Sequence, residues 1–290
     1  MSNPALSNNP ALNGKTLTAE ELNRIYDQPA ANLQRPGVDG AAASAAVVGA
    51  AAHTNMGQQP PVVGSDQPMT YENTISKTVF LFILVVAGAG LGWWLMPVFP
   101  AIVFVGAIAG LVLGLVNAFK KEPSVPLIVG YAVSQGLFLG GFSMLMESVY
   151  PGIVMQAVLG TMSVFAVTLL LFRSGKVRTS PKMTKIFLIA MGGYLVFSLL
   201  NVVLMLTGVA TDPWGLRGAT IGGIPLGVII GGLAVLLAAY SLVMDFELIK
   251  NGVQNRVPEK WGWSAAFGLM VTLIWLYVEI LRIIAIFRSN

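Results

Sequence analysis

The stretch ATIGGIPLGVIIGGLAVLLAAYSLVMDFE, residues 219–247, decides the fold class of this chain. Its only charged side chains are Asp245 and Glu247, both at its carboxyl end. An α-helix rises 1.5 Å per residue, so about 20 apolar residues cross the roughly 30 Å hydrocarbon core of a bilayer. The stretch therefore predicts a transmembrane helix.

The rest of the chain has the composition of an integral membrane protein. Of its 290 residues, 55% are hydrophobic and 10% are charged, whereas an average soluble domain carries about 25% charged residues. Apolar runs lie at roughly 79–97, 100–119, 125–147, 152–172, 186–207, 219–247 and 263–287. Backbone groups in lipid must bond to one another, which favours helices. We therefore predict an all-α polytopic bundle of seven transmembrane helices.

Residues 1–68 differ from this pattern and are predicted to form a disordered tail. They are rich in Ala, Asn, Pro, Gly and Gln, and they hold too few large apolar side chains to offset the entropy of folding. A helix-capping pattern predicts one short helix at residues 18–27. That helix is either transient or a docking segment for a partner. Residues 69–290 then form the membrane domain, and residues 69–78 are expected to lead into the first span along the interface.

Lysine and arginine side chains predict the orientation. They gather in the loops after the second, fourth and sixth spans, whereas the other loops hold only Arg217. Loops rich in these residues stay in the cytoplasm in multi-pass proteins. We therefore expect the amino terminus inside the cell and the carboxyl terminus outside.

Glycines recur at intervals of four residues in several spans. Small residues at this spacing let helix backbones approach closely in the bilayer, so we interpret them as contacts between helices. The residues concerned are Gly106, Gly110, Gly114, Gly136, Gly140, Gly223, Gly227 and Gly231.

Composition also argues against several classes of chemistry. The chain has no cysteine, and its one histidine, His53, lies in the tail. The spans contain no Ser-His or Gly-x-Ser-x-Gly arrangement, and the basic residues lie in short loops. We therefore expect no enzyme, no cofactor and no nucleic-acid partner. The expected partners are the lipid bilayer and, through the tail, another membrane protein; the oligomeric state is left open.

Ionisable side chains at membrane depth are costly, so each one is a candidate functional residue. Asp245 lies near the cytoplasmic end of the sixth span, and Glu147 ends the third. Glu279 and Arg282 lie three residues apart in the seventh span, where they share a helix face and can pair. Counting 1.5 Å per residue puts Asp245 near the inner boundary and Glu279 in the outer part, so these two are not expected to pair directly.

Both functional and structural roles fit these residues. Burial favours the neutral form of a carboxyl group, which can then sense pH, and an ionised carboxylate attracts a hard cation such as Ca²⁺. The structural alternatives are an interfacial charge for Glu147, a local salt bridge for Glu279 and Arg282, and a helix-end anchor for Asp245. Glu147 can also share the outer region with Glu279 and Arg282.

Three segments resemble the Bax inhibitor-1/YccA-like membrane proteins, and the chain is similar to a divergent bacterial subfamily. They are YAVSQGLFLGGFS at 131–143, MDFELI at 244–249 and LRI at 281–283. The resemblance covers about residues 70–288. It implies a pH-sensitive leak of cations, most of all Ca²⁺, across the bacterial inner membrane. The alternative that it implies is a non-transporting regulator of another membrane protein, such as a membrane AAA protease.

The resemblance also implies which residues sense pH. Asp245 matches one of the family's two pH-sensing aspartates, whereas Thr272 stands in place of the second. Gln135 stands where the family often has glutamate, and the second span lacks the family's latching arginine. Either Asp245 works with neutral partners such as Thr272 and Gln135, or the acidic gate has moved outward to Glu147 and Glu279.

Overall fold

The computed structural model describes residues 67–289. Within that range, seven helices are long and apolar enough to cross a membrane, which confirms the predicted all-α multi-pass bundle. The predicted short helix at 18–27 and almost all of the predicted tail lie outside the described residues. The seven helices are α4 (Tyr71–Leu95), α5 (Ile102–Phe119), α6 (Val125–Val149), α7 (Ile153–Arg173), α8 (Pro181–Leu206), α9 (Leu226–Gln254) and α10 (Trp261–Ser289).

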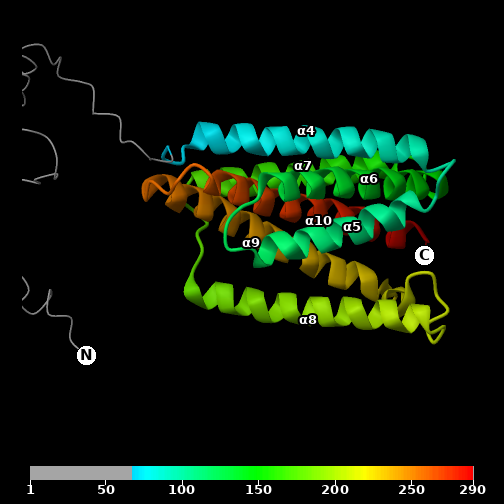
Figure 1. The fold of residues 1–290 in the computed structure, drawn as a ribbon. Helices are drawn as coiled ribbons and strands as arrows, with labels where there is room; N and C mark the ends of the chain where they lie inside the picture. Colours follow the sequence, from blue (N-terminus) through cyan, green and yellow to red (C-terminus); the bar gives the residue numbers. More distant parts are fainter. Residues whose placement is uncertain (1–66, 290) are drawn as a thin grey trace, which may run out of the picture. The chain divides into compact units, whose positions relative to one another are not determined.

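Successive helices run in opposite directions along the bundle (Figure 1). We call the end at which α4, α6, α8 and α10 begin the basic end, because the lysine-rich loops lie there, and we call the opposite end the far end. α10 is the most enclosed helix, with half of its membrane span buried, whereas only 11% of the span of α8 is buried. α10 therefore forms the centre of the bundle, and α8 lies at its edge (Figure 1).

The first helix begins earlier than hydropathy predicts. Residues 71–78, most of the segment expected to lead into the first span, form the first turns of α4, which starts at Tyr71. Thr70 caps this start: its side chain accepts a hydrogen bond of 3.2 Å from the backbone N–H of Asn73. A capped helix can extend past its apolar run, so two polar turns precede the apolar part of α4.

The sixth span shows the opposite difference. The predicted span began at residue 219, but α9 begins at Leu226, after the short helix η2 (Gly215–Gly218) and a hairpin of β1 (Thr220–Ile221) and β2 (Ile224–Pro225). Gly222 and Gly223 form the turn, and both have positive φ angles. A two-residue hairpin turn of this kind favours glycine at both positions. A hydropathy scale does not distinguish apolar residues in a strand from apolar residues in a helix. The predicted span therefore included the hairpin.

Glycines allow α6 to contact α4 and α5 through their backbones. A Cβ atom built on Gly136 would lie 2.5 Å from Val85 O, and one built on Gly106 would lie 2.7 Å from Phe138 N. A Cβ on Gly140 would lie 2.6 Å from the carbonyl carbon of Ala89. These distances are shorter than van der Waals contact, so glycine is required there. The interpretation of the glycine spacing as helix packing holds at these positions.

Replacing Gly140 with alanine tests this packing. We expect Gly140→Ala to destabilise the protein by roughly 1–3 kcal/mol, because the methyl group forces α4 and α6 apart. The matched control is Gly90→Ala on α4, where a Cβ would meet nothing within 4 Å. It should leave stability unchanged or raise it by up to about 1 kcal/mol, since alanine favours a helix. Thermal unfolding in detergent measures both, and equal melting temperatures would contradict the packing argument.

Candidate functional site

Asp245 lies on the face of α9 that packs against α10. Its Oδ2 atom accepts a hydrogen bond of 2.7 Å from Thr272 Oγ1. A Cβ atom on Gly268 would lie 3.2 Å from Asp245 Oδ1, so this glycine leaves room for the carboxyl group between the two helices. Thr272 is buried, whereas Asp245 is half-buried. The carboxyl group is therefore held inside the bundle and is still partly accessible.

A second hydroxyl group extends this contact. Ser241 Oγ lies 3.2 Å from Thr272 Oγ1, and Thr272 Oγ1 also lies 3.2 Å from the carbonyl oxygen of Gly268. Sequence analysis placed Thr272 by alignment with the family but did not select Ser241. The signal was present, because Ser241 and Asp245 are four residues apart and therefore share one face of α9. We call Ser241, Asp245 and Thr272 the Asp245 site.

No ion pair of the described residues includes Asp245. The basic side chains that form ion pairs have other partners: Lys77 with Glu259, Lys260 with Glu122 and Arg282 with Glu279. Residues 67–289 also contain no cluster of three or more metal-ligating side chains. The Asp245 site is thus a single carboxyl group that is bonded to the Thr272 hydroxyl group and can bind or release a proton.

The structure does not bring Gln135 to the Asp245 site. The Gln135 side chain packs against α5 at Gly110, where it fills the space that a Cβ would need. No hydrogen bond within the described range joins it to Asp245. The expectation that Gln135 is a neutral partner of Asp245 is therefore not met, because this residue lies on the α5 side of α6.

Glu279 and Arg282 form the predicted ion pair on α10. The Glu279 side chain is 1% exposed, and its Oε1 also accepts hydrogen bonds from Tyr194 of α8 and from Trp275 Nε1. Arg282 donates to the hydroxyl oxygen of Tyr194 at 2.8 Å. The pair therefore attaches the peripheral helix α8 to the central helix α10. Sequence analysis missed Tyr194, which carries no charge and has no motif.

Arg217 belongs to the same region, although its sequence position suggested an exposed loop. It is 4% exposed and donates a 2.7 Å hydrogen bond to Ser198 Oγ on α8. Its guanidinium group lies 5.6 Å from the ring centres of Tyr194 and Phe197. The one available signal was that Arg217 stands alone in loops otherwise free of positive charge.

Glu147 does not join Glu279 in an outer acidic site. Its two carboxylate oxygens accept hydrogen bonds from the backbone N–H groups of Gly152, at 2.6 Å, and Val154, at 3.0 Å. These N–H groups lie at the start of α7, where a helix lacks partners of its own and attracts negative charge. Glu147 is therefore a helix cap, and the proposed outward gate of Glu147 and Glu279 is not assembled.

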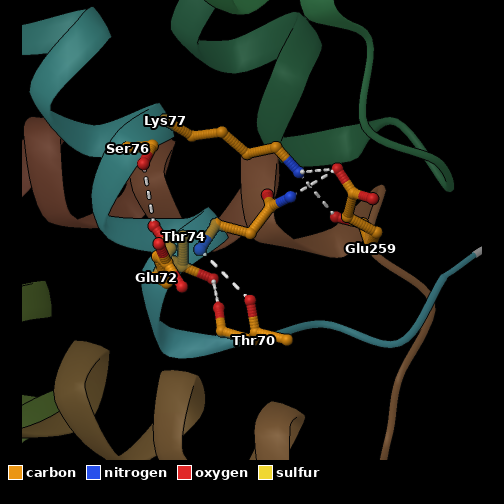
Figure 2. A network of polar contacts seen from close by, with 7 residues as sticks. Thr70, Glu72, Thr74, Ser76, Lys77 and Glu259 are labelled. Carbon is orange, nitrogen blue, oxygen red and sulfur yellow. Dashed lines mark hydrogen bonds and ion pairs between the residues drawn. The ribbon is translucent and has the colours of Figure 1, made fainter.

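A polar network at the basic end ties α4 to the loop between α9 and α10 (Figure 2). Lys77 donates to Oε1 of Glu259 at 3.1 Å and to its backbone oxygen at 3.0 Å. Asn73 donates to the same Oε1 at 2.7 Å. These hydrogen bonds, Asn73 first, and the charge of Lys77 hold the pKa of Glu259 below its ordinary value. We call these three residues the Glu259 network.

Backbone contacts strengthen the same junction. Met69 N donates to Val257 O at 2.7 Å, and Glu259 N donates to Gln67 O at 2.7 Å. Met69 is buried, and its sulfur lies against Gly252 near the end of α9. The residues just before α4 are therefore hydrogen-bonded to the loop after α9, the helix that carries Asp245.

The chain matches one protein-family model. That model is described as Bax inhibitor 1 like, and it matches residues 3–289. The match includes all seven helices as well as residues 131–143 and 244–249, whose resemblance to this family was noted from sequence. No curated protein matches the chain.

The Glu259 network predicts an acid-dependent contribution to stability. Because the pKa of Glu259 is lowered in the folded state, the network stabilises the fold at neutral pH, and this contribution disappears as the pH falls through the folded-state pKa. Glu259→Gln should therefore lower stability by about 1 kcal/mol at pH 7 and by much less near pH 3, a modest value because Glu259 is partly exposed.

Thermal unfolding of the variant and the parent at both pH values measures this difference. The control is Glu122→Gln, which removes the exposed pair with Lys260 and should change the melting temperature little at either pH. A Glu259→Gln effect of the same size at pH 7 and pH 3 would contradict an ionic role.

Proposed function

This chain belongs to the Bax inhibitor 1 like family and spans the membrane several times, and we propose that it is a pH-sensitive leak pathway for cations, Ca²⁺ foremost, controlled by Asp245. The observation that supports this function is the half-buried Asp245 carboxyl group, which accepts a hydrogen bond from the Thr272 hydroxyl group and has no cationic partner in the described residues. Binding or release of a single proton then determines whether Asp245 carries a negative charge between α9 and α10.

Ionisation of Asp245 changes the hydrogen bonds that its neighbours must donate. A hydroxyl group has one proton to donate, and the Thr272 hydroxyl lies within reach of Asp245 Oδ2, Gly268 O and Ser241 Oγ. The ionised carboxylate accepts the hydrogen bond from this hydroxyl group. Asp245 Oδ1 has no hydrogen-bond donor among residues 67–289, so water or a passing cation completes its shell. The protonated group needs neither the hydrogen bond from Thr272 nor a water molecule or cation at Oδ1. The two forms of Asp245 therefore favour different contacts between α9 and α10.

The other acidic side chains inside or near the spans have fixed structural partners. Arg282 neutralises Glu279, backbone N–H groups hold Glu147, and Thr179 donates to Glu247 through both its backbone N–H and its hydroxyl group. Of the two gates that sequence analysis left open, the arrangement therefore favours Asp245 with Thr272. Gln135 has no part in it.

The proposed location is the bacterial inner membrane, with the basic end in the cytoplasm. Loops rich in lysine and arginine at that end support this orientation. Asp245 lies in the half of α9 nearer the basic end, so the proposed sensor responds to cytoplasmic pH. Cations are its cargo, and no resident cofactor is required.

Asp245→Asn tests the proposal directly. In vesicles that contain the purified protein and a Ca²⁺ dye, the parent should show a several-fold change in flux between about pH 5 and pH 8. The variant should show less than a twofold change, because asparagine cannot ionise. The control is Glu247→Gln on the same helix, which should keep the pH dependence. Absence of flux in the parent at every pH would contradict a leak and favour the alternative, a non-transporting regulator of another membrane protein.

Thr272→Val tests the hydroxyl partner at nearly constant side-chain volume. A hydrogen bond to a charged group contributes about 1.5–3 kcal/mol, and 1.36 kcal/mol corresponds to one pH unit. Loss of this bond disfavours the ionised form, so the pH midpoint of flux should rise by about 1–2 units. Ser241→Ala should shift the midpoint less, because Ser241 contacts Thr272 and not the carboxyl group. An unchanged midpoint in Thr272→Val would mean that Thr272 does not tune the sensor.

A further inference from the structure

An apolar groove runs along the bundle between α4 and α7. Its volume is about 510 Å³, and α6 and α10 form its floor. Phe82, Val86 and Gly90 line it from α4, and Val158 and Met162 line it from α7. A Cβ atom on Gly90 would meet nothing within 4 Å, because this glycine faces the open space of the groove.

The groove has the depth of one leaflet. Along α4 it extends from Phe82 to Trp93, which is about 16 Å at 1.5 Å per residue. The hydrocarbon core of a bilayer is about 30 Å thick, so one leaflet contributes about 15 Å. The residues that line the groove from α6 and from α7 lie in the far-end half of each helix. The groove is therefore about as long as one leaflet is thick, and it lies mainly in the far-end half of the bundle.

The hydroxyl groups that line the groove already have partners within the protein. Ser143 Oγ and Tyr277 OH lie 2.7 Å apart, and Thr161 donates to the carbonyl oxygen of Ala157 at 2.7 Å. None of the three needs a water molecule or a polar ligand. The groove consequently presents an apolar surface along its length, and a hydrocarbon chain fits its chemistry.

We propose that this groove binds one acyl chain of a bilayer phospholipid in the far-end leaflet. The seven spans place the opening between α4 and α7 in the hydrocarbon region, where phospholipid is the solvent. The volume falls within the roughly 300–1,000 Å³ of ligand pockets, and four helices enclose the site more than a flat lipid-facing surface does. Trp93 lines the end near the interface, where tryptophan side chains lie beside lipid head groups.

A transmembrane helix of a partner fits the groove less well. Such a helix is about 10–12 Å wide and needs about 30 Å of contact to pair along its span. The groove extends along only about 16 Å of α4, so a partner helix would leave it before it had crossed the membrane. An acyl chain extends through one leaflet, about 15 Å, so its length matches that of the groove.

Photo-crosslinking with a phospholipid that carries a diazirine in the middle of one acyl chain tests this site. The intact protein is reconstituted in vesicles that contain the probe, and the modified residues are located by mass spectrometry. We expect labelling to concentrate on the groove faces of α4 and α7. Gly90→Leu places a side chain in the groove at a position where a Cβ meets nothing within 4 Å, and it should reduce that labelling at least fivefold.

Matched variants separate loss of the site from loss of the fold. Gly193→Leu places the same side chain on α8, where a Cβ would also meet nothing within 4 Å, and it should leave groove labelling unchanged. Val158→Trp fills the groove from the opposite wall and should repeat the Gly90→Leu result. Each variant should elute as the parent does in size-exclusion chromatography.

Three results would overturn the proposal. Labelling spread evenly over all lipid-facing helices would mean that the groove holds only bulk lipid. Labelling that neither Gly90→Leu nor Val158→Trp reduces would place the chain elsewhere. Crosslinks between two copies of the protein through residues introduced at Val86 and Val158 would mean that another subunit covers the groove.

Discussion

Hydrocarbon offers no hydrogen bond to a polar group, so each polar side chain within the seven spans needs a partner inside the protein or access to water. Many hydroxyl groups bond to the backbone carbonyl four residues earlier, as Ser134, Thr161 and Ser163 do. Others pair across helices, as Ser143 does with Tyr277. This constraint explains where polar residues of the bundle lie and makes the exceptions informative.

The charged residues obey the same constraint at a higher cost. Glu279, Arg282 and Tyr194 bind one another between α8 and α10, although Glu279 Oε2 and Arg282 Nε have no hydrogen-bond partner in the described range. Arg217 is held by Ser198 and by two aromatic rings. Asp245 differs from Glu279, because its hydrogen-bond donor in the described range is a hydroxyl group and no ion pair there includes it. That difference supports a functional role for Asp245 and a structural one for Glu279.

Sequence analysis predicted the features that depend on one helix at a time. The number of spans follows from apolar length, the Glu279–Arg282 pair from a spacing of three residues, and the role of Gly140 from its spacing to Gly136. Features that depend on which helices meet could not be predicted. The rotation of α6 turns Gln135 toward α5, and the fold of the loop before α9 buries Arg217. Resemblance to the family supplied Thr272, because an alignment carries contact information that periodicity lacks.

The resemblance to the family implies that Thr272 stands in place of a second aspartate, and this affects the shape of the proposed pH response. Two carboxyl groups in contact titrate as a coupled pair, in two steps that belong to both. A carboxyl group beside a hydroxyl group titrates once, since threonine does not ionise in this range. A pathway controlled by the Asp245 site should therefore respond to a single proton, with a transition spread over about two pH units and no second step. In the proposed pathway, Asp245 supplies that transition and its hydrogen bond with Thr272 sets the pH at which it occurs.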